Sequence, residues 1–597
     1  MKTRRLKLND RRNFFNINSE EEFLYILKTK YRTMNTLNLT KKRIVLICVF
    51  LAIFTIGTVF IFITPLSVKS TYGLSTQTSD GVTISFNVFE PSSGGLNKPA
   101  IIIGHGSMVN KEMVKGYALE LAAVGFVAIP FDFRGHGQSS MVEPDNKTKD
   151  VIAIKEYLNN RGDIDMNSLG YIGYSMGGLG QELIHQDLAF TCFIGIGTWL
   201  YPTLRDGDST NPLNVLMIQA LFDEAVELPA LKQSLANRTG IPVSNVDVNK
   251  LYGSFQEDNA SMIYLDDNSN HLTVAWDEDF IREARDWAIN SFDLDVVDET
   301  FYVNIRGLIL LFQVIGGIGF FFLTIEPLSK LILTSKGDRE KQIQYYKIEV
   351  TGMSVISITI KTILFSIVLG ILGVLIFIPL LLILPLAVAG FVVALLFGQA
   401  FGLIVLLWRL GKKSDSNLRT ILSKPFKSRN NLLKQAILGA ILGAMLFLIA
   451  YLSIGLNYLG LVPSITKVWT MPIYFLISFF VILILNLVTQ GVIQNKFSDS
   501  LKDTMKVLFL GAIFPLLYYI VYLLLVSVLM RSLFYFGTFI PISILMFTLT
   551  SGVSVISYRK TGNVITGAII NAVLLTFLIV TISTPQSGLS FIARLLF

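Results

Sequence analysis

The stretch Leu169-Gly170-Tyr171-Ile172-Gly173-Tyr174-Ser175-Met176-Gly177-Gly178-Leu179-Gly180 decides how the rest of the chain is interpreted. Its apolar beginning predicts a short strand, its centre is a Gly-x-Ser-x-Gly turn, and its small residues predict a helix directly after the serine. Gly173 and Gly177 let strand and helix pass close together, while Ser175 takes a strained backbone position. Ser175 is therefore the candidate nucleophile.

A nucleophilic serine needs a base, and the chain contains four histidines. After a turn of this kind, the acid and then the histidine follow the serine along the chain. His271 lies in the loop after the last predicted strand of this region, and it is the only histidine downstream of Ser175 beyond the helix of the serine itself. We predict that His271 is the general base; the alternative is a solvated loop histidine.

The acid that orients the histidine is expected just past the preceding strand. Asp223 follows the apolar run 214–220, and we favour it over its neighbour Glu224. Less favoured carboxylates are Asp206, Asp208 and Asp266. The alternative interpretation is an ordinary acidic strand end on an acidic domain.

Two main-chain amides are expected to stabilise the oxyanion. One is the N–H of Met176, at the start of the helix after the nucleophile. The other comes from the loop Gly104-His105-Gly106-Ser107-Met108, whose glycines permit close backbone approach. We choose the N–H of Ser107, with Met108 as the alternative, and interpret His105 as a structural residue that supports this loop.

Three motifs, together with Asp223 and His271, resemble the α/β-hydrolase superfamily, and most closely its esterase and dienelactone-hydrolase-like branches. The motifs are Gly104-His105-Gly106, Phe131-Asp132-Phe133-Arg134-Gly135-His136-Gly137-Gln138-Ser139 and Gly173-Tyr174-Ser175-Met176-Gly177-Gly178. The resemblance covers roughly residues 78–293. It implies that the Asp-x-Arg-Gly-x-Gly-x-Ser stretch is a structural turn, so that His136 is not catalytic. The C-terminal part of the chain resembles no family.

Strand-like and helix-like patterns alternate over residues 67–302 and predict an α/β domain with a mostly parallel sheet and helices on both faces. The expected elements are a hairpin over 82–89, strands over 100–103, 126–131, 169–174, 190–197, 214–220 and 261–265, and helices over 111–124, 148–159, 175–186, 228–236 and 277–292.

Members of that superfamily with a bulky cap domain usually insert it after the strand that here ends near Gly197. Only a short segment separates this strand from the next one, so a large lid is absent from the sequence. The segment contains Trp199-Leu200-Tyr201-Pro202, and we expect Trp199 and Tyr201 to bind substrate as an apolar wall. We expect an open site beside a membrane, suited to an extended or lipid-borne substrate.

Composition places the domain in a membrane protein. Of 597 residues, 52% are apolar and 16% are charged. Residues 67–302 carry a net charge of −17, whereas the remainder carries +24, and nucleic acid is an unlikely partner for either part. The two cysteines, Cys48 and Cys192, form no disulfide framework.

The predicted organisation has four parts. Residues 1–43 are a basic cytoplasmic segment, and residues 44–66 are an uncleaved transmembrane anchor. Residues 67–302 are an extracytoplasmic hydrolase domain inserted between that anchor and an all-α polytopic domain, residues 303–597, of about eight helices. The spans are expected near 307–327, 362–385, 387–408, 435–456, 473–494, 507–530, 533–557 and 564–583.

Charges in the loops orient these spans, about nine in all, in the cell membrane. The expected cytoplasmic loops carry Lys336, Arg339, Lys341, Lys412, Lys413, Arg419, Lys424, Lys427, Arg429, Lys496, Lys502, Lys506, Arg559 and Lys560, whereas the outside turns carry little more than Lys467 and Arg531. Every loop obeys the positive-inside rule, so the N-terminus is expected in the cytoplasm.

Ionisable residues are nearly absent from the middles of the spans, which lowers the case for an ion-coupled transporter. The main polar residues inside the spans are Gln399, Asn486, Gln490 and Asn571. Gly439 and Gly443 form a Gly-x-x-x-Gly pair that marks close helix packing within the bundle or between subunits, or arises by chance in a glycine-rich segment.

The leading hypothesis is a membrane-bound serine hydrolase that cleaves an ester of a lipid or envelope component through an acyl-enzyme, without a metal or cofactor. Its partners would be the ester substrate and membrane lipids, with a helix-mediated oligomer as a further expectation. An acyltransferase or a peptidase with the same triad is the first alternative. The second is a transporter or channel whose hydrolase-like domain is a non-catalytic sensor.

Overall fold

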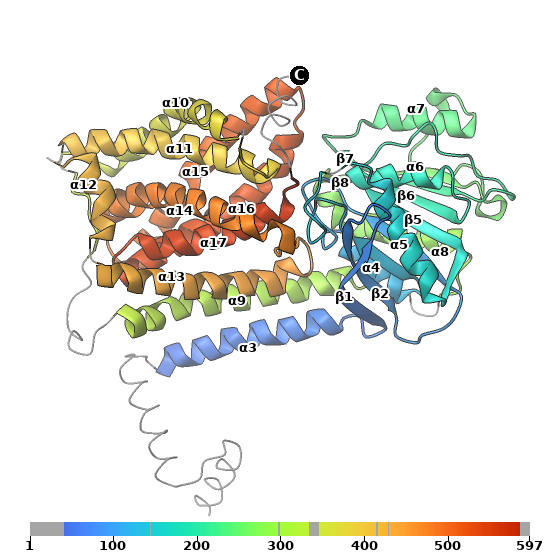
Figure 1. Cartoon of the computed structure of the whole chain (residues 1–597), viewed down its shortest axis with the longest axis horizontal. Coiled ribbons are helices and arrows are strands. Elements are labelled where there is room, and N and C mark those ends of the chain that lie inside the picture. The colour runs from blue at the N-terminus through green and yellow to red at the C-terminus, as the bar shows by residue number, and fades with distance from the viewer. Residues whose placement is uncertain are drawn as a thin grey trace, which may run out of the picture.

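The computed structural model describes residues 41–143, 145–296, 299–333, 345–350, 352–381, 383–413, 416–427 and 429–585. Nearly all of the predicted cytoplasmic segment 1–43 and the basic residues Lys336, Arg339 and Lys341 lie outside the described residues. The chain forms a sheet domain and a bundle of long helices that lie side by side (Figure 1).

Eight strands form one mixed sheet. They are β1 (Val68–Gln77), β2 (Thr83–Pro91), β3 (Lys98–Gly104), β4 (Val127–Phe131), β5 (Ile164–Tyr174), β6 (Phe190–Ile196), β7 (Asn214–Phe222) and β8 (Ser261–Asn270). Their order across the sheet is β1-β2-β4-β3-β5-β6-β7-β8, with β2 antiparallel to both neighbours and all strands from β4 to β8 parallel. This is the sheet of the α/β-hydrolase fold, so the predicted fold class is confirmed.

One sequence prediction about the sheet is wrong. Residues 82–89 do not form a hairpin but the single strand β2, and its hairpin partner is β1, joined to it by a turn in which the N–H of Thr78 donates to Val82 O. The strand β1 was not predicted because its sequence is rich in serine and threonine and much of it is exposed, so it lacks a clear apolar alternation.

Helices cover both faces of the sheet. On one face α4 (Lys115–Ala123) and α8 (Glu278–Ser291) pack into an apolar core, and on the other lie α5 (Thr148–Arg161), α6 (Gln181–Ile184) and α7 (Leu228–Thr239). The helix expected from Lys111 begins four residues later, at Lys115. The reason is local: the Lys111 N–H donates to Asp132 Oδ1 (2.8 Å) instead of pointing along a helix.

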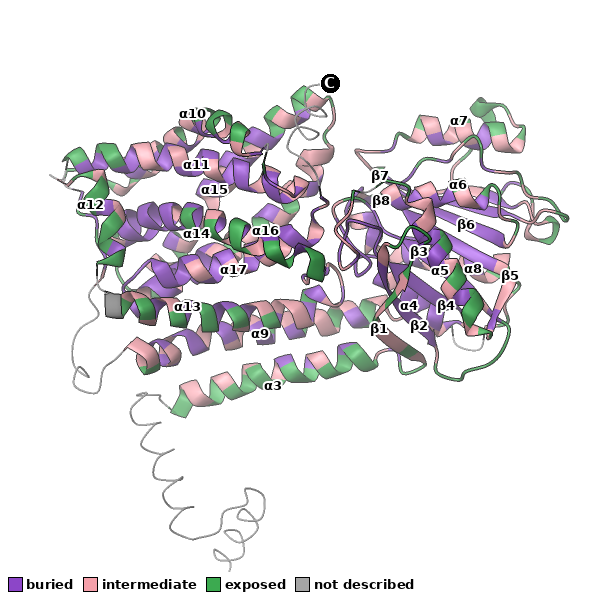
Figure 2. Cartoon of the chain, in the orientation of Figure 1, coloured by how far each residue is buried: buried purple, intermediate pink, exposed green. Residues whose placement is uncertain are grey.

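Within the described residues, nine helices are long and apolar enough to cross a membrane, in agreement with the predicted number. They lie in α3 (Lys41–Ile63), α9 (Val303–Leu333), α10 (Val355–Leu381), α11 (Ala387–Lys413), α13 (Arg429–Ala450), α14 (Met471–Val488), α15 (Leu501–Met530), α16 (Phe534–Thr561) and α17 (Ile565–Ile582). The helices α3 and α9 run alongside each other at one edge of the bundle, and much of α3 is exposed (Figures 1 and 2).

Contacts inside the bundle settle two features of the sequence. A Cβ on Gly439 would lie 2.9 Å from Ile569 Cβ, and one on Gly443 would lie 3.2 Å from Val573 Cγ2, so the Gly-x-x-x-Gly pair packs α13 against α17 of the same chain. At the end of α9 far from the sheet domain, Glu326 pairs with three basic side chains. They are Arg43 (2.5 Å), Lys330 (2.7 Å) and Lys560 (2.7 Å).

The sheet domain docks on the bundle through the loops at the carboxyl ends of its strands. The side-chain amide of Asn110, after β3, exchanges two hydrogen bonds with the main chain of Gly460 (3.0 and 2.8 Å), which lies 350 residues away. The N–H of Ser464 donates to Gly137 O (3.0 Å), and that of Met141 donates to Thr466 Oγ1 (2.8 Å). The edge of the sheet at the carboxyl ends of its parallel strands therefore faces the helices.

Candidate active site

The nucleophile elbow has the backbone that its sequence predicts. Ser175 follows β5 and has a φ of +50°, a left-handed conformation that is strained for a side chain other than glycine. A Cβ on Gly173 would lie 2.7 Å from Gly177 O, and one on Gly177 would lie 2.3 Å from Gly104 O. The small residues are thus required for the close crossing. The predicted helix opens as a 3₁₀ segment, Ser175–Gly180, which the short α6 continues.

The structure brings the predicted serine, histidine and aspartate into one chain of hydrogen bonds. Ser175 Oγ lies 2.9 Å from Nε2 of His271, which directly follows β8. Nδ1 of the same ring lies 2.9 and 3.0 Å from the two carboxylate oxygens of Asp223, which directly follows β7. With Nδ1 donating to the carboxylate, Nε2 can accept the serine proton, and this is the arrangement that activates a hydroxyl.

The two neighbouring acids occupy different places. Asp223 Oδ1 accepts hydrogen bonds from the N–H groups of Ala225 (2.8 Å) and Val226 (2.9 Å), which fix the carboxylate against the imidazole. Glu224 instead accepts from the main-chain N–H of His271 through Oε2 (3.1 Å). Of the carboxylates among the described residues, Asp223 is the one at the ring, whereas Glu224 holds the backbone that carries it.

A glycine that the sequence did not single out stands beside these groups. Gly197, at the end of β6, has a φ of +50°. A Cβ there would lie 3.1 Å from Asp223 Oδ2 and 3.2 Å from His271 Nδ1. Any side chain would crowd the bond between acid and histidine. The available sequence signal was the glycine at the end of a predicted strand.

The loop after β3 passes under the nucleophile. A Cβ on Gly106 would lie 2.7 Å from the Tyr174 ring and 3.1 Å from Ser175 Cβ. Ser107 and Met108, the two expected sources of an oxyanion donor, line the same cavity as Ser175, and Met108 has a φ of +59°. Met176, the other expected donor, is the second residue of the 3₁₀ segment that begins at Ser175.

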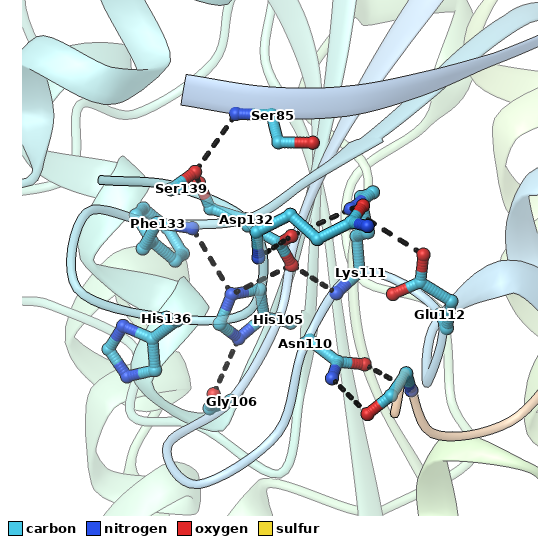
Figure 3. Close-up of polar contacts among 12 residues, drawn as sticks. Ser85, His105, Gly106, Asn110, Lys111, Glu112, Asp132, Phe133, His136 and Ser139 are labelled. Atoms are coloured by element: carbon cyan, nitrogen blue, oxygen red, sulfur yellow. Dashed lines mark hydrogen bonds and ion pairs between the residues drawn. The ribbon is translucent and has the colours of Figure 1, made fainter. Parts of the chain in front are cut away.

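His105 supports this loop from beneath (Figure 3). Its Nδ1 donates to Gly106 O (2.6 Å), and its Nε2 accepts the N–H of Phe133 (3.1 Å). Burial lowers the pKa of His105 to about 4, so the ring is neutral at physiological pH. These contacts agree with the structural interpretation of His105.

Asp132 is the centre of the polar network around His105 (Figure 3). Lys111 Nζ donates to Asp132 Oδ2 (2.7 Å), and the N–H of Gln138 donates to the same oxygen (2.9 Å). Burial is the largest single influence and acts to raise the pKa of the Asp132 carboxyl, but the charge of Lys111 and the hydrogen bonds from Lys111 and Gln138 together lower it. His136, which the family resemblance excludes from catalysis, donates to Arg134 O through Nδ1 (3.0 Å), and burial lowers its pKa.

The expectation of an open site is wrong. The Phe534 ring, at the start of α16, lies 5.5 Å from the His271 ring, and the site opens into a cavity that continues into the bundle. The helices α11, α14, α15, α16 and α17 line this cavity, so the membrane domain stands where a cap domain would be.

Trp199 and Tyr201 are not among the residues that line this cavity. Gln181 holds their main chain, because its Nε2 donates to Trp199 O (2.8 Å) and its Oε1 accepts the N–H of Tyr201 (2.9 Å). The apolar wall expected from this segment is supplied instead by helix residues such as Phe534, Phe539 and Ile542.

Three carboxylates, those of Asp266, Asp277 and Asp279, lie close enough together to suggest a cation site. Asp277 already has a structural role, because its side chain caps α8 by accepting from the N–H of Asp279 (3.0 Å). Ser269 also donates to Asp277. The cluster is accounted for by the helix start, and we assign no metal to it.

Comparison with known proteins gives partial matches. No family model matches the chain. An uncharacterised 31.7 kDa protein of Escherichia coli, from the traX–finO intergenic region, is 30% identical over 105 residues, 17% of this chain and 36% of that protein. An uncharacterised protein of Mycobacterium tuberculosis is 28% identical over 102 residues, with the same coverage of 17% and 36%. The chain thus spans about a third of the length of these relatives.

Solved structures of hydrolases are similar to part of this chain. An esterase of Pyrococcus furiosus covers 38% of this chain and 94% of its own, with 15% identity and a TM-score of 0.30. A cold-adapted esterase from an Arctic intertidal metagenomic library covers 38% and 96%, with 18% identity and a TM-score of 0.28. A putative dienelactone hydrolase of Klebsiella pneumoniae covers 38% and 98%, with 12% identity and a TM-score of 0.28.

Proposed function

We propose that the chain is a membrane-bound serine hydrolase that cleaves an ester of a lipid or envelope component. Ser175 attacks the acyl carbon while His271 takes its proton, and Asp223 orients and stabilises the imidazolium. The N–H groups of Ser107 and Met176 stabilise the oxyanion. His271 then protonates the leaving alkoxide, and water releases the acyl group from Ser175 by the same steps.

The single observation that carries this proposal is that one cavity joins Ser175 and His271 to the interior of the membrane bundle. Its walls are mainly aliphatic and aromatic side chains, which favour a hydrocarbon chain over a peptide or a sugar. A substrate that lies partly in the bilayer would place its chain among the helices and its ester at the nucleophile. In this arrangement the helices of the bundle would bind the chain of the substrate during the reaction.

We further propose that the sheet domain faces the outside of the cell. The support is the charge distribution: Arg43, Lys330 and Lys560 gather at the end of the bundle far from the sheet domain. In this orientation the ester would be reached from the outer leaflet. If an alcohol or amine replaced water at the acyl-enzyme, the same residues would perform acyl transfer.

A membrane-impermeant fluorophosphonate, which reacts with activated serines, tests the nucleophile and the orientation together. Intact cells with the wild-type protein are expected to be labelled, and those with Ser175→Ala or His271→Ala are not. The matched control is Ser209→Ala, at an exposed serine of the same domain, which should label like the wild type. Labelling that appears only after permeabilisation would mean that the sheet domain faces the cytoplasm. A folded wild-type protein that is never labelled would favour a non-catalytic domain.

A further inference from the structure

Four amide side chains from three membrane helices line the cavity that begins at Ser175. They are Gln399 in α11, Asn486 in α14, Gln490 just after α14, and Asn571 in α17. Amide side chains inside a membrane bundle are costly and usually functional. We call this set the four amides.

Asn571, one of the four amides, lies far from the nucleophile. Phe534 contacts His271 at the start of α16, and Ser554, which accepts from Asn571 Nδ2 (2.9 Å), is 20 residues further along the same helix. At 1.5 Å per residue this separation is about 30 Å. The hydrocarbon of one membrane leaflet is only about 15 Å thick. The cavity therefore extends beyond the reach of one ordinary leaflet.

Two of the four amides have polar atoms without a protein partner. Among the described residues, neither Gln399 Nε2 nor Asn571 Oδ1 has a hydrogen-bond partner, although these residues are only 2% and 1% exposed. A buried polar atom left unpaired costs about 1–3 kcal/mol. One of the free atoms is a donor and the other an acceptor, and a hydroxyl group, which both accepts and donates, matches the chemistry of either atom.

The lining of the cavity favours an uncharged ligand as the partner of these two polar atoms. No lysine, arginine, aspartate or glutamate is among the described residues that line the cavity. An ion would therefore meet no counter-charge at a depth where an unpaired charge costs several kcal/mol. An ordinary alkyl chain, by contrast, would end against amides and leave them unpaired.

We propose that the cavity binds a long-chain acyl ester whose chain carries an uncharged hydrogen-bonding group, such as a terminal hydroxyl, and that the four amides bind this group. The inference rests on the proposed function and names its substrate class. The ester lies at Ser175, the alkyl segment lies between α14, α15 and α16, and the hydroxyl reaches Gln399 and Asn571.

Binding to the full-length Ser175→Ala protein tests this inference without requiring turnover. The probes are methyl esters of plain and ω-hydroxy fatty acids in matched pairs of increasing length from dodecanoate upward, and the readout is the midpoint of thermal unfolding in detergent. We expect the ω-hydroxy ester to bind at least tenfold more tightly than its plain partner, with a maximum at the length that brings the hydroxyl to the amides.

The variant Gln399→Met, made in the same background, replaces the amide with an apolar side chain of similar shape. It should bring the ratio of the two affinities close to one, and should not lower the stability of the unliganded protein, because an unpaired polar atom is removed. The matched control is Gln435→Met, at a buried amide of α13 that donates to Thr561 O and is not among the cavity-lining residues. This control should keep the preference for the ω-hydroxy ester.

Equal binding of plain and hydroxylated esters in every pair would overturn the inference, and would indicate that the amides hold water only. The inference would also be overturned if the Gln399→Met variant still bound the ω-hydroxy esters more tightly than the plain esters. Neither result bears on the proposed function, which fails only if fluorophosphonate does not label Ser175 in the wild type.

Discussion

The carboxyl edge of the sheet and the cavity in the bundle both bury polar side chains, but they differ in how those side chains are paired. At the sheet, both ring nitrogens of His271 and both carboxylate oxygens of Asp223 have partners. In the cavity, Gln399 and Asn571 each keep an atom that no described residue satisfies. The hydrogen bonds among Ser175, His271 and Asp223 are complete without a ligand, whereas those of Gln399 and Asn571 are not.

This difference separates catalysis from recognition. A catalytic set must be fixed before the substrate arrives, because reorganisation during the reaction would raise the barrier. A binding region gains selectivity when its polar groups are satisfied only by the correct ligand, since a ligand without the matching group leaves them buried and unpaired. In the proposed function the sheet domain would provide the reaction, and the bundle would provide the choice of substrate.

The largest expected effect concerns the two neighbouring acids. Asp223→Asn should lower kcat for a short soluble ester by about 10⁴-fold, because the imidazole loses the carboxylate that holds its tautomer. Glu224→Gln should cost no more than about tenfold, since its contact is a single hydrogen bond to the main chain of His271. Steady-state kinetics of the purified variants measures both. Comparable losses in the two variants would mean that Glu224 shares the role of the acid.

The next largest effect concerns the stability contributed by His105, which supports the loop beneath the nucleophile. Burial lowers the pKa of His105 to about 4, against about 6.5 in an unfolded chain. Between these values the unfolded state binds more protons, so the folding free energy contributed by this group is fully present above pH 6.5 and falls as the pH drops towards 4. The loss is about 3 kcal/mol, or up to roughly 10 °C in the unfolding midpoint.

Replacing the ring isolates this contribution. In His105→Gln, whose side chain does not titrate, the midpoint should fall less steeply between pH 6.5 and 4 than in the wild type, whatever its value at neutral pH. Differential scanning fluorimetry across that window gives the slope. Identical slopes would show that His105 is already protonated in the folded protein, or that unfolding starts in the bundle.

Local sequence patterns were sufficient for much of the sheet domain. The turn around Ser175 predicts a strained backbone, which in the structure is left-handed, and the order of serine, acid and histidine predicts which side chains meet. Long apolar runs predict nine spans because each span depends on its own residues alone. The polar strand β1 was not predicted, because strands are recognised in a sequence by the alternation of apolar and polar residues.

What could not be predicted depends on contacts between distant segments. Asn110 and Gly460 are 350 residues apart, and nothing in either loop indicates that the bundle covers the site. The same holds for the amides: the sequence shows them within separate spans, but their meeting in one cavity depends on how three helices pack. For this reason Trp199 and Tyr201 were expected to form a wall that the helices supply instead.

The smallest expected effect tests whether the cavity, and not the sheet domain alone, selects the chain. Thr538 lines the cavity one turn beyond Phe534, so Thr538→Trp should narrow the passage just past the nucleophile. The ratio of kcat/KM for a hexadecanoyl ester to that for a butyryl ester should fall by about 10- to 100-fold, the range for about 1.4–2.8 kcal/mol of lost chain binding. The control is Thr548→Trp on the same helix, at an exposed residue outside the cavity lining. If both tryptophans change the ratio equally, the alkyl chain of the substrate does not pass through the bundle. The unpaired amides in the cavity would then have no effect on which substrate is chosen.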